Sequence, residues 1–462
     1  MAHTSREANE DLARLVEEAG ASRKWIAVRV NQIGAEHGVA LRYEHTSVSR
    51  WVNLGMVPRG RAPEFLAAAL AERLGRPVTV EDIGMCTAPD RGRSMGLDFP
   101  RDPADGVRAA ATYWRAVDRR NFLTNGGFAL SAFTTPVTRW LSRPAAEPPP
   151  GRGGRQVGRS DIEELWAASD EARLWDSKFG GGNWKTSSVT HCLTTRAAPL
   201  LQGTYTEAVG RELFTATAEL SRVVGWAAFD TGQHEVAQAR FIQALSLARA
   251  AGDIETGCYV LSTMALQTFL RGYPDHAADM AEGAYERARG HAAPRVLAFA
   301  KLAEARAHAR AGNASAAGKA LAASERLLES IRPGSHDPEH LAYFTYARLA
   351  TDAIEIHRDL KKPLAALRWA RLADPMPAAQ FTRATGIRLA VLASSHLQNG
   401  DLDRGLQAAA QATDILRSVQ STRASNYLHA ITDDLAPWTA DSRAKEFIHR
   451  SRGREPFLPR IP

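Results

Sequence analysis

The fold of this chain is decided by a stretch that recurs along its second half, GWAAFDTGQHEVAQARFIQALSLA at residues 225–248. A glycine is followed by a small residue five and twelve positions later, and the pattern recurs at spacings of 40, 40 and 88 residues. The aligned positions are Gly232, Gly272, Gly312 and Gly400, then Ala237, Ala277, Ala317 and Gly405, then Ala244, Ala284, Ser324 and Ala412. Since 88 is 40 plus 48, we expect a degenerate unit near Leu360, with Ala365 and Trp369 in the second helix and the glycine lost.

Self-similarity at a period near 40 indicates a repeat architecture. Each unit is predicted to be a helix, a tight glycine turn and a second helix, with small residues where the two helices cross. The pattern resembles the tetratricopeptide repeat, best in the first unit, with Gly225 in one helix and Phe241 in the other. One helix pair cannot bury its apolar face alone, so such pairs stack into a superhelix. The alternative is an Ala-rich helical bundle without superhelical order.

Residues 1–87 show four or five short helical patterns separated by caps and glycines. Thr4-Ser5-Arg6-Glu7 has the pattern of a capping box that opens the first helix. The third helix is predicted to span Ser47–Leu54 with Thr46 as its cap and with Val48, Trp51 and Val52 facing inward. This arrangement is typical of a helix-turn-helix domain, in which the third helix would be the recognition helix.

The polar positions around this helix suit contact with DNA. Hydroxyl, amide and guanidinium groups bind base edges and phosphates, so Arg50 would pair with guanine and Asn53 with adenine. The predicted DNA-binding residues are Arg42, Thr46, Ser47, Ser49, Arg50, Asn53, Arg59 and Arg61. The alternative is an ordinary solvated helix face. The connection between the second and third helices, roughly Ala35 to His45, is longer than the usual turn and leaves their geometry open.

With both parts in view, the chain resembles a group of actinobacterial, Streptomyces-type transcriptional regulators. They combine a phage-repressor-like helix-turn-helix with a C-terminal tetratricopeptide-like region. The stretches that carry the resemblance are GASRKWIAVRVN from Gly20, TSVSRWVNLGMVPRG from Thr46, LGRPVTVEDIGM from Leu74, WDSKFGGG from Trp175, and the run from PLLQGTY at Pro199 to Ala248. The resemblance implies transcriptional control, commonly repression, of sporulation or secondary metabolism.

The net charge is +7 over 462 residues, which by itself is a weak indication of a polyanionic partner. Its distribution is more informative. Residues 23–61 carry seven basic and two acidic side chains, whereas residues 1–22 carry two and five. Residues 92–160 carry eleven basic and five acidic side chains, and the remaining 302 residues are nearly balanced. The basic excess therefore lies on the predicted recognition helix with its flanks, and on the segment that follows.

The sequence predicts four regions: a helix-turn-helix domain at 1–87, a basic helical segment with a Pro/Gly-rich linker at 88–160, a tetratricopeptide-like domain at 161–450, and a tail at 451–462. The linker proper is Arg143–Arg159. Aromatic residues spaced through 105–141, such as Trp114 and Trp140, are more typical of a core than of a single-stranded nucleic-acid platform. An extension of the DNA-binding domain or a dimer contact are further alternatives for this segment.

A glycine-rich stretch invites a second site. Phe179-Gly180-Gly181-Gly182-Asn183 would cradle a phosphate if a strand preceded it, but none is predicted, so a turn between helices is favoured. The alternative is a hinge or effector contact formed by Asp176, Phe179, Gly180, Gly181, Gly182 and Trp184.

Other chemistry finds no support in the sequence. It has no GxSxG, HExxH or Walker motif, and Cys86, Cys192 and Cys258 form no CxxC pair, so neither catalytic nor metal-binding residues are predicted. No run of about 18 apolar residues exists and the N-terminus lacks the pattern of a secretory signal. We therefore expect a cytoplasmic, nucleoid-associated protein without a cofactor that is neither an enzyme nor membrane-bound.

These observations favour a transcriptional regulator that binds double-stranded DNA as a homodimer. The helical repeat region would dimerise, or sense a small-molecule, peptide or protein effector, or do both. An interaction scaffold with a weak or vestigial DNA-binding module is the alternative, and a phosphate-ligand binder centred on Gly180–Gly182 is a third hypothesis.

Overall fold

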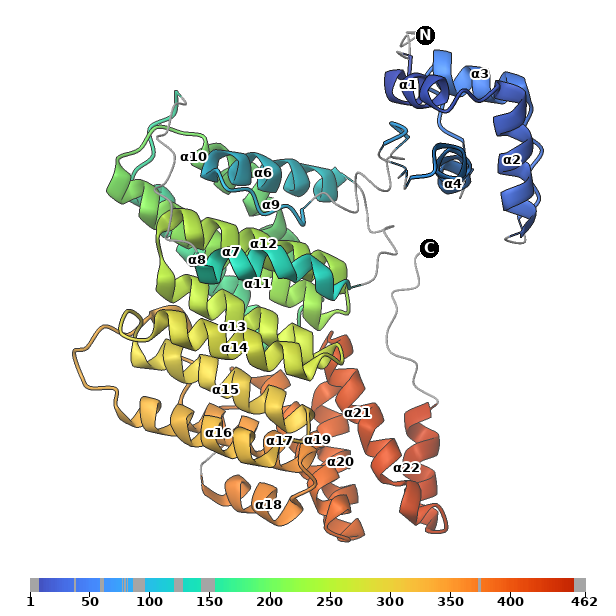
Figure 1. The fold of residues 1–462 in the computed structure, drawn as a ribbon. Coiled ribbons are helices and arrows are strands. Elements are labelled where there is room, and N and C mark those ends of the chain that lie inside the picture. Colours follow the sequence, from blue (N-terminus) through green and yellow to red (C-terminus); the bar gives the residue numbers. More distant parts are fainter. Residues whose placement is uncertain are drawn as a thin grey trace. The chain divides into compact units, whose positions relative to one another are not determined.

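The computed structural model describes residues 8–36, 39–58, 62–76, 78, 80, 82–85, 96–119, 128–142, 154–372 and 375–452. The all-α class predicted from the sequence is confirmed, because these residues form helices and no strand, with one isolated bridge between Gln156 and Thr204. None of the described helices is long and apolar enough to cross a membrane. The chain divides into two compact units, Met1–Met95 and Gly96–Pro462 (Figure 1).

The N-terminal unit is built from α1 (Glu10–Glu18), α2 (Arg23–Glu36), α3 (His45–Asn53) and α4 (Ala62–Leu74). Its core is formed by apolar side chains from all four helices, among them Leu12, Ile26, Val48, Trp51 and Leu66. Helix α1 begins later than the sequence suggested: Asn9 caps it, and its side-chain oxygen accepts a bond from the Leu12 backbone N–H at 2.9 Å. The predicted capping box at 4–7 lies outside the described residues.

The C-terminal unit is a stack of helical pairs that follow one another along the chain (Figure 1). In each pair, two consecutive helices pack closely along their lengths. The pairs are α11 (Glu207–Asp230) with α12 (His234–Ala251), α13 (Ile254–Leu270) with α14 (Pro274–Ala288), α15 (Pro294–Arg310) with α16 (Ala314–Glu329), α17 (Tyr346–Asp359) with α18 (Pro363–Leu372), and α19 (Thr382–Gln398) with α20 (Leu402–Leu416).

Further elements precede, interrupt and follow these pairs. They are α6 (Pro103–Arg119), η1 (Leu130–Phe133), α7 (Thr134–Ser142), α8 (Arg159–Phe179), α9 (Trp184–Cys192), η2 (Leu193–Ala197), α10 (Ala198–Leu201), η3 (Glu339–Leu341), α21 (Thr422–Asp434), η4 (Ala436–Trp438) and α22 (Ser442–Arg452).

The repeated glycines lie in the turns within the pairs, as the spacing predicted. Gly232, Gly272, Gly312 and Gly400 have φ values of +83°, +91°, +78° and +80°, which side chains with a Cβ rarely adopt. Small residues also allow the helices of a pair to approach closely: a Cβ on Gly225 of α11 would lie 2.8 Å from the Phe241 ring of α12.

The degenerate unit is present, but its register differs by one residue from the prediction. The turn between α17 and α18 places Lys361 at φ +56°, the position that glycine occupies in the other units. Ala366, five residues later, is fully buried in the close-packed position, whereas Ala365 is only half-buried. A lysine without the freedom of glycine thus holds a left-handed backbone conformation here.

Helices α6 and α7 lie within the 88–160 segment of the sequence-based division, and they pack on the helical stack. Helix α6 contacts α12, and α7 contacts α12 and α14. Trp114 of α6 is fully buried and its indole N–H donates to Gln243 Oε1 at 2.6 Å. Trp140 of α7 lies where a Cβ on Gly257 would clash with its ring. These two rings belong to the core and present no face to a nucleic acid.

Candidate nucleic-acid interface and ligand cavity

Helix α3 divides into an inward and an outward face as predicted. Val48, Trp51 and Val52 are buried, whereas Thr46, Arg50 and Asn53 are exposed, and Ser47 and Ser49 are half-buried. The prediction that Thr46 caps the helix is wrong, because α3 begins at His45 with Glu44 as its N-cap residue. The hydroxyl of Thr46 therefore lies in the first helical turn.

The long connection between α2 and α3 is clamped to α2. The Asn31 side-chain amide donates to the Tyr43 carbonyl and its oxygen accepts from the Tyr43 N–H, both at 2.9 Å. The Tyr43 ring packs edge-to-face on Trp51 with centroids 4.9 Å apart. The extra residues therefore do not loosen α3, because a side chain of α2 fixes the backbone just before it.

The structure adds Arg23, which the sequence reasoning missed. This first residue of α2 donates to Ser49 Oγ at 3.1 Å and to Asn53 Oδ1 at 3.2 Å, and it is exposed. Its guanidinium thus lies on the outward face of α3, beside two predicted base-contacting groups. Nothing in the local pattern reveals this contact, because Arg23 is 26 and 30 residues away from its partners.

The pairing of charges in this unit is uneven. Arg29 binds Glu72 at 2.7 Å and Glu36 at 3.0 Å, and the bond from Arg29 lowers the pKa of the Glu72 carboxyl. Arg76 binds Glu18 at 2.8 Å. By contrast, the exposed side chains of Arg23, Arg42 and Arg50 form no ion pair with the described residues of the unit, and Arg59 and Arg61 lie outside them. Unpaired positive charge therefore surrounds α3.

In the C-terminal unit, Gly180–Gly182 form a buried joint between distant parts of the chain. The Gln420 N–H donates to the Phe179 carbonyl at 2.8 Å, and the Gly182 N–H donates to the Gln420 carbonyl at 3.1 Å. A Cβ on Gly180 would lie 2.5 Å from the Gln420 carbonyl oxygen, and one on Gly181 2.3 Å from the Ala227 carbonyl oxygen. These glycines are required because backbone passes where side chains would be.

The joint does not leave room for a phosphate. The Gly181 N–H donates to Asp230 Oδ2 at 3.0 Å, so a carboxylate of the protein already holds the donor that would bind the anion. The phosphate-cradle interpretation is therefore wrong. Of the residues predicted as an effector contact or hinge, Asp176 lines a cavity whereas Phe179 and Gly180–Gly182 do not, and the Trp184 side chain lies outside the description.

Two buried carboxylates tie the joint together. Asp176 of α8 binds Arg383 of α19 through both oxygens, at 2.6 and 2.8 Å. Asp230 at the end of α11 binds Arg383 at 2.8 Å and Arg423 of α21 at 3.0 Å. Burial alone would raise the pKa of the Asp230 carboxyl, but the two guanidinium groups hold it below its usual value. The start and end of the stack are thus joined by ion pairs whose partners are about 200 residues apart in sequence.

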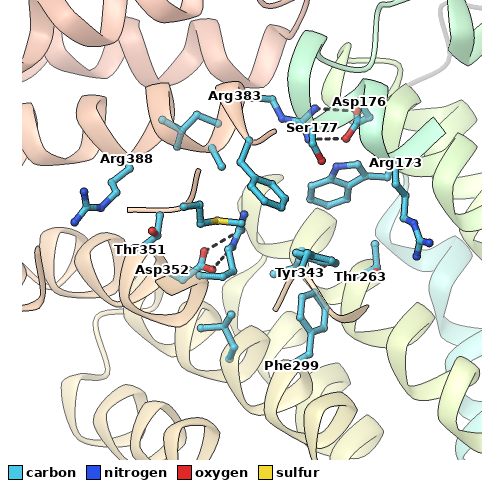
Figure 2. A pocket seen from close by; sticks show the side chains of 18 of the residues that line it. Arg173, Asp176, Ser177, Thr263, Phe299, Tyr343, Thr351, Asp352, Arg383 and Arg388 are labelled. Atoms are coloured by element: carbon cyan, nitrogen blue, oxygen red, sulfur yellow. Dashed lines mark hydrogen bonds and ion pairs between the residues drawn. The ribbon is translucent and has the colours of Figure 1, made fainter. Parts of the chain in front are cut away.

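Beside this joint lies a cavity of about 340 Å³, lined by residues of α8, α11, α13, α15, α17 and α19 (Figure 2). One part of its wall is apolar and largely aromatic, with Trp226, Phe299, Leu302, Phe381 and Ile387. Arginines form much of the rest: Arg173, Arg222, Arg306, Arg348, Arg383, Arg388 and Arg423. A concave site with an apolar wall and a few converging charged groups has the composition of a small-molecule site.

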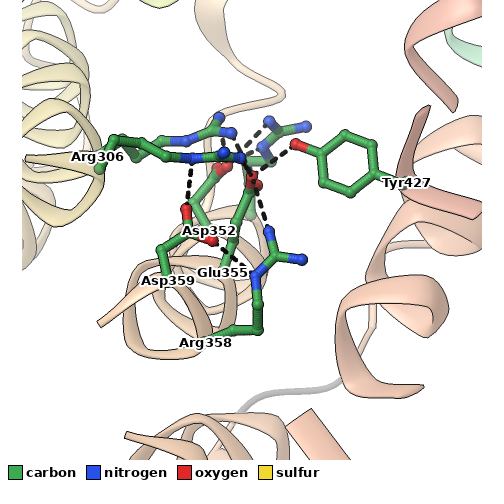
Figure 3. Close-up of polar contacts among 8 residues, drawn as sticks. Arg306, Asp352, Glu355, Arg358, Asp359 and Tyr427 are labelled. Atoms are coloured by element: carbon green, nitrogen blue, oxygen red, sulfur yellow. Dashed lines mark hydrogen bonds and ion pairs between the residues drawn. The ribbon is translucent and has the colours of Figure 1, made fainter. Parts of the chain in front are cut away.

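A network of ion pairs includes three residues that line this cavity, Arg306, Asp352 and Glu355 (Figure 3). Arg306 donates to Asp352 at 3.0 Å and to Glu355 at 2.7 Å, and the Tyr427 hydroxyl donates to Glu355 at 2.6 Å. Burial opposes ionisation of Glu355, yet Arg306 and two further arginines keep the pKa of its carboxyl well below the usual range. Other members of the network, Arg310, Arg358, Asp359 and Tyr427, line a second cavity of about 400 Å³.

The described residues contain no cluster of three or more His, Cys, Asp or Glu side chains with the geometry to hold a metal ion. A family model matches part of the N-terminal unit. The family model described as the SP15 N-terminal domain matches residues 12–86, which lie within the N-terminal unit. No curated protein matches the chain.

Proposed function

We propose that this chain is a DNA-binding transcriptional regulator, with an N-terminal helix-turn-helix of the phage-repressor type and a C-terminal tetratricopeptide-like solenoid. The observation that carries the proposal is the outward face of α3, where Arg50 and Asn53 are exposed and Arg23 donates a hydrogen bond to Asn53. A helix that is held by its buried face and exposes an arginine and an amide fits the major groove, where these groups distinguish guanine and adenine.

The uncompensated arginines support this proposal. Phosphate contacts supply most of the affinity for DNA and fix the register of the protein on it. Arg23 and Arg42, which form no ion pair with the described residues of the unit, are suited to phosphates, and Arg50 to a base. The Ser49 and Asn53 side chains that now accept from Arg23 would exchange this partner for DNA.

The C-terminal unit is proposed to dimerise or to sense an effector, or both. A single recognition helix buries little DNA, so paired half-sites multiply affinity and make a homodimer the expected form. From the resemblance to Streptomyces-type regulators, we propose repression of differentiation or secondary metabolism. The protein would act in the cytoplasm, on the nucleoid, without a cofactor and without catalysis.

The test starts from genome-wide mapping of bound DNA in the native host, which supplies the operator. A gel-shift titration then compares the unmodified chain with Arg50→Ala and with Arg14→Ala, a matched control whose arginine is 65% exposed and paired with Asp11 on α1. Loss of a bidentate base contact is worth about 1–3 kcal/mol, so Arg50→Ala should weaken operator binding roughly 5- to 150-fold. Unchanged binding would refute the role of α3, and no binding even at low salt would favour the interaction scaffold.

A further inference from the structure

The arginines of the 340 Å³ cavity are not equally compensated. Six of the seven bind a carboxylate. These pairs are Arg173 with Glu219 at 3.3 Å, Arg222 with Glu219 at 2.7 Å, Arg306 with Asp352 at 3.0 Å, Arg348 with Asp352 at 2.7 Å, Arg383 with Asp176 at 2.6 Å, and Arg423 with Asp230 at 3.0 Å.

Arg388 of α19 is the exception. Its Nη2 donates to the Ala370 carbonyl at 3.0 Å, and no carboxylate among the described residues binds it. Figure 2 shows Arg388 on the opposite side of the cavity from the joined Asp176 and Arg383. The side chain is half-buried, and this burial lowers the pKa of its guanidinium. The other N–H groups of this guanidinium form no hydrogen bond to the described residues.

The rest of the wall limits what the ligand can be. Asp176, Asp352 and Glu355 are nearly inaccessible and already hold arginines, so a ligand cation has no free carboxylate there to bind. Glu339, the remaining acid of the wall, is exposed to solvent, which screens its charge. The apolar part of the wall, with Trp226, Phe381 and Ile387, favours an apolar and preferably aromatic body.

We propose that this cavity binds a small organic monoanion, an aromatic or similarly apolar body with one carboxylate that forms a bidentate pair with Arg388. Arginine suits a planar carboxylate because two parallel N–H groups match its two oxygens. A single charge is expected because one guanidinium of the wall binds no carboxylate of the described residues, and a second negative charge would lie near the existing carboxylates. The idea that this ligand is the effector of a regulator rests on the proposed function, whereas the idea that the cavity binds it does not.

The test measures binding to the full chain by isothermal titration calorimetry, in the absence of DNA. The probes are benzoate, 2-naphthoate and 4-biphenylcarboxylate, each compared with its neutral amide. We expect at least one carboxylate to bind, and its amide to bind more weakly. Charge-assisted hydrogen bonds are about twice as strong as neutral ones, so Arg388→Gln should weaken that carboxylate roughly 10- to 100-fold while leaving the amide nearly unchanged.

The control variant is Arg404→Gln, which removes an arginine that is 73% exposed and does not line the cavity, and it should bind like the unmodified chain. Arg388→Lys keeps the charge but loses the bidentate geometry, so intermediate binding is expected. The proposal is overturned if no carboxylate binds, if the amides bind equally well, or if Arg388→Gln binds like Arg404→Gln. A carboxylate that binds but leaves the affinity for the operator unchanged would refute the effector role of the ligand, while the binding site itself would stand.

Discussion

The joint between the two ends of the helical stack depends on Asp230, and removing this carboxylate should loosen the joint. Asp230 is fully buried and receives bonds from Arg383, Arg423 and the Gly181 N–H. In Asp230→Ala, Arg383 keeps Asp176, but Arg423 loses its carboxylate and the Gly181 N–H loses its acceptor. Breaking a buried ion pair by removing one partner costs about 3–5 kcal/mol. A melting temperature lower by roughly 4–7 °C is expected for a unit of this size.

Thermal unfolding followed by circular dichroism measures this loss, and hydrogen exchange locates it. Faster exchange is expected at the amides of Gly181, Gly182 and Gln420, which bond across the joint. The control is Asp414→Ala, which removes a 67% exposed carboxylate paired with Arg417 and should change stability by less than about 1 kcal/mol. If Asp230→Ala melts like Asp414→Ala and the three amides stay protected, the joint does not hold the stack together.

The same carboxylate should make the joint sensitive to acid. The pKa of Asp230 is lower in the folded chain than its usual value of 3.8, so the unfolded chain binds the proton more readily. The stabilisation is therefore present above about pH 4 and is lost as the pH falls through the lower folded-state value. Asp230→Asn should abolish this part of the acid dependence, and an unfolding midpoint that falls equally steeply below pH 4 in the variant would contradict this assignment.

Four further variants test other parts of the structure. Lys361→Gly should stabilise the C-terminal unit by about 0.5 kcal/mol in thermal unfolding, because it relieves a left-handed conformation, whereas Gly272→Ala, which has open space around its Cβ, should cost about 1 kcal/mol. Asn31→Ala should destabilise the N-terminal unit by about 1–3 kcal/mol in urea unfolding, because the Tyr43 backbone loses both bonds to the clamp. Burial, aided by Arg271, lowers the pKa of His234 to about 4, so NMR should find the imidazole neutral at pH 5. The unmodified chain should therefore lose stability as the pH falls from 6.5 to 4, and His234→Gln should abolish this loss.

The stacked helical pairs were predictable because their cause is local. A turn that needs φ near +80° selects glycine, and a close crossing selects a small residue a fixed distance later, so both leave a period in the sequence. The same rule shows why the degenerate unit was placed one residue off. Lys361 has the conformation without the glycine that would mark it, and both Ala365 and Ala366 satisfy the requirement for a small residue.

The cavity and the joint were not predictable because their causes are not local. Arg383 and Asp176 are 207 positions apart, and no spacing rule connects them. The glycines of the joint did attract attention in the sequence, but with the wrong explanation. A glycine that makes room for another part of the backbone looks the same in the sequence as one that makes room for a phosphate, and only the fold shows that Gln420 and Ala227 fill the space.

The net charge of a region does not show where its unpaired charges lie. The first 91 residues are balanced, with twelve basic and twelve acidic side chains, yet the arginines around α3 are unpaired, whereas four of the acids bind Arg14, Arg29 and Arg76 elsewhere in the unit. Residues 161–462 are nearly neutral as well, yet one cavity arginine, Arg388, binds no carboxylate of the described residues. A charge acts on a ligand only where no neighbour neutralises it, so the pairing of each arginine, and not the total of +7, decides where an anion can bind.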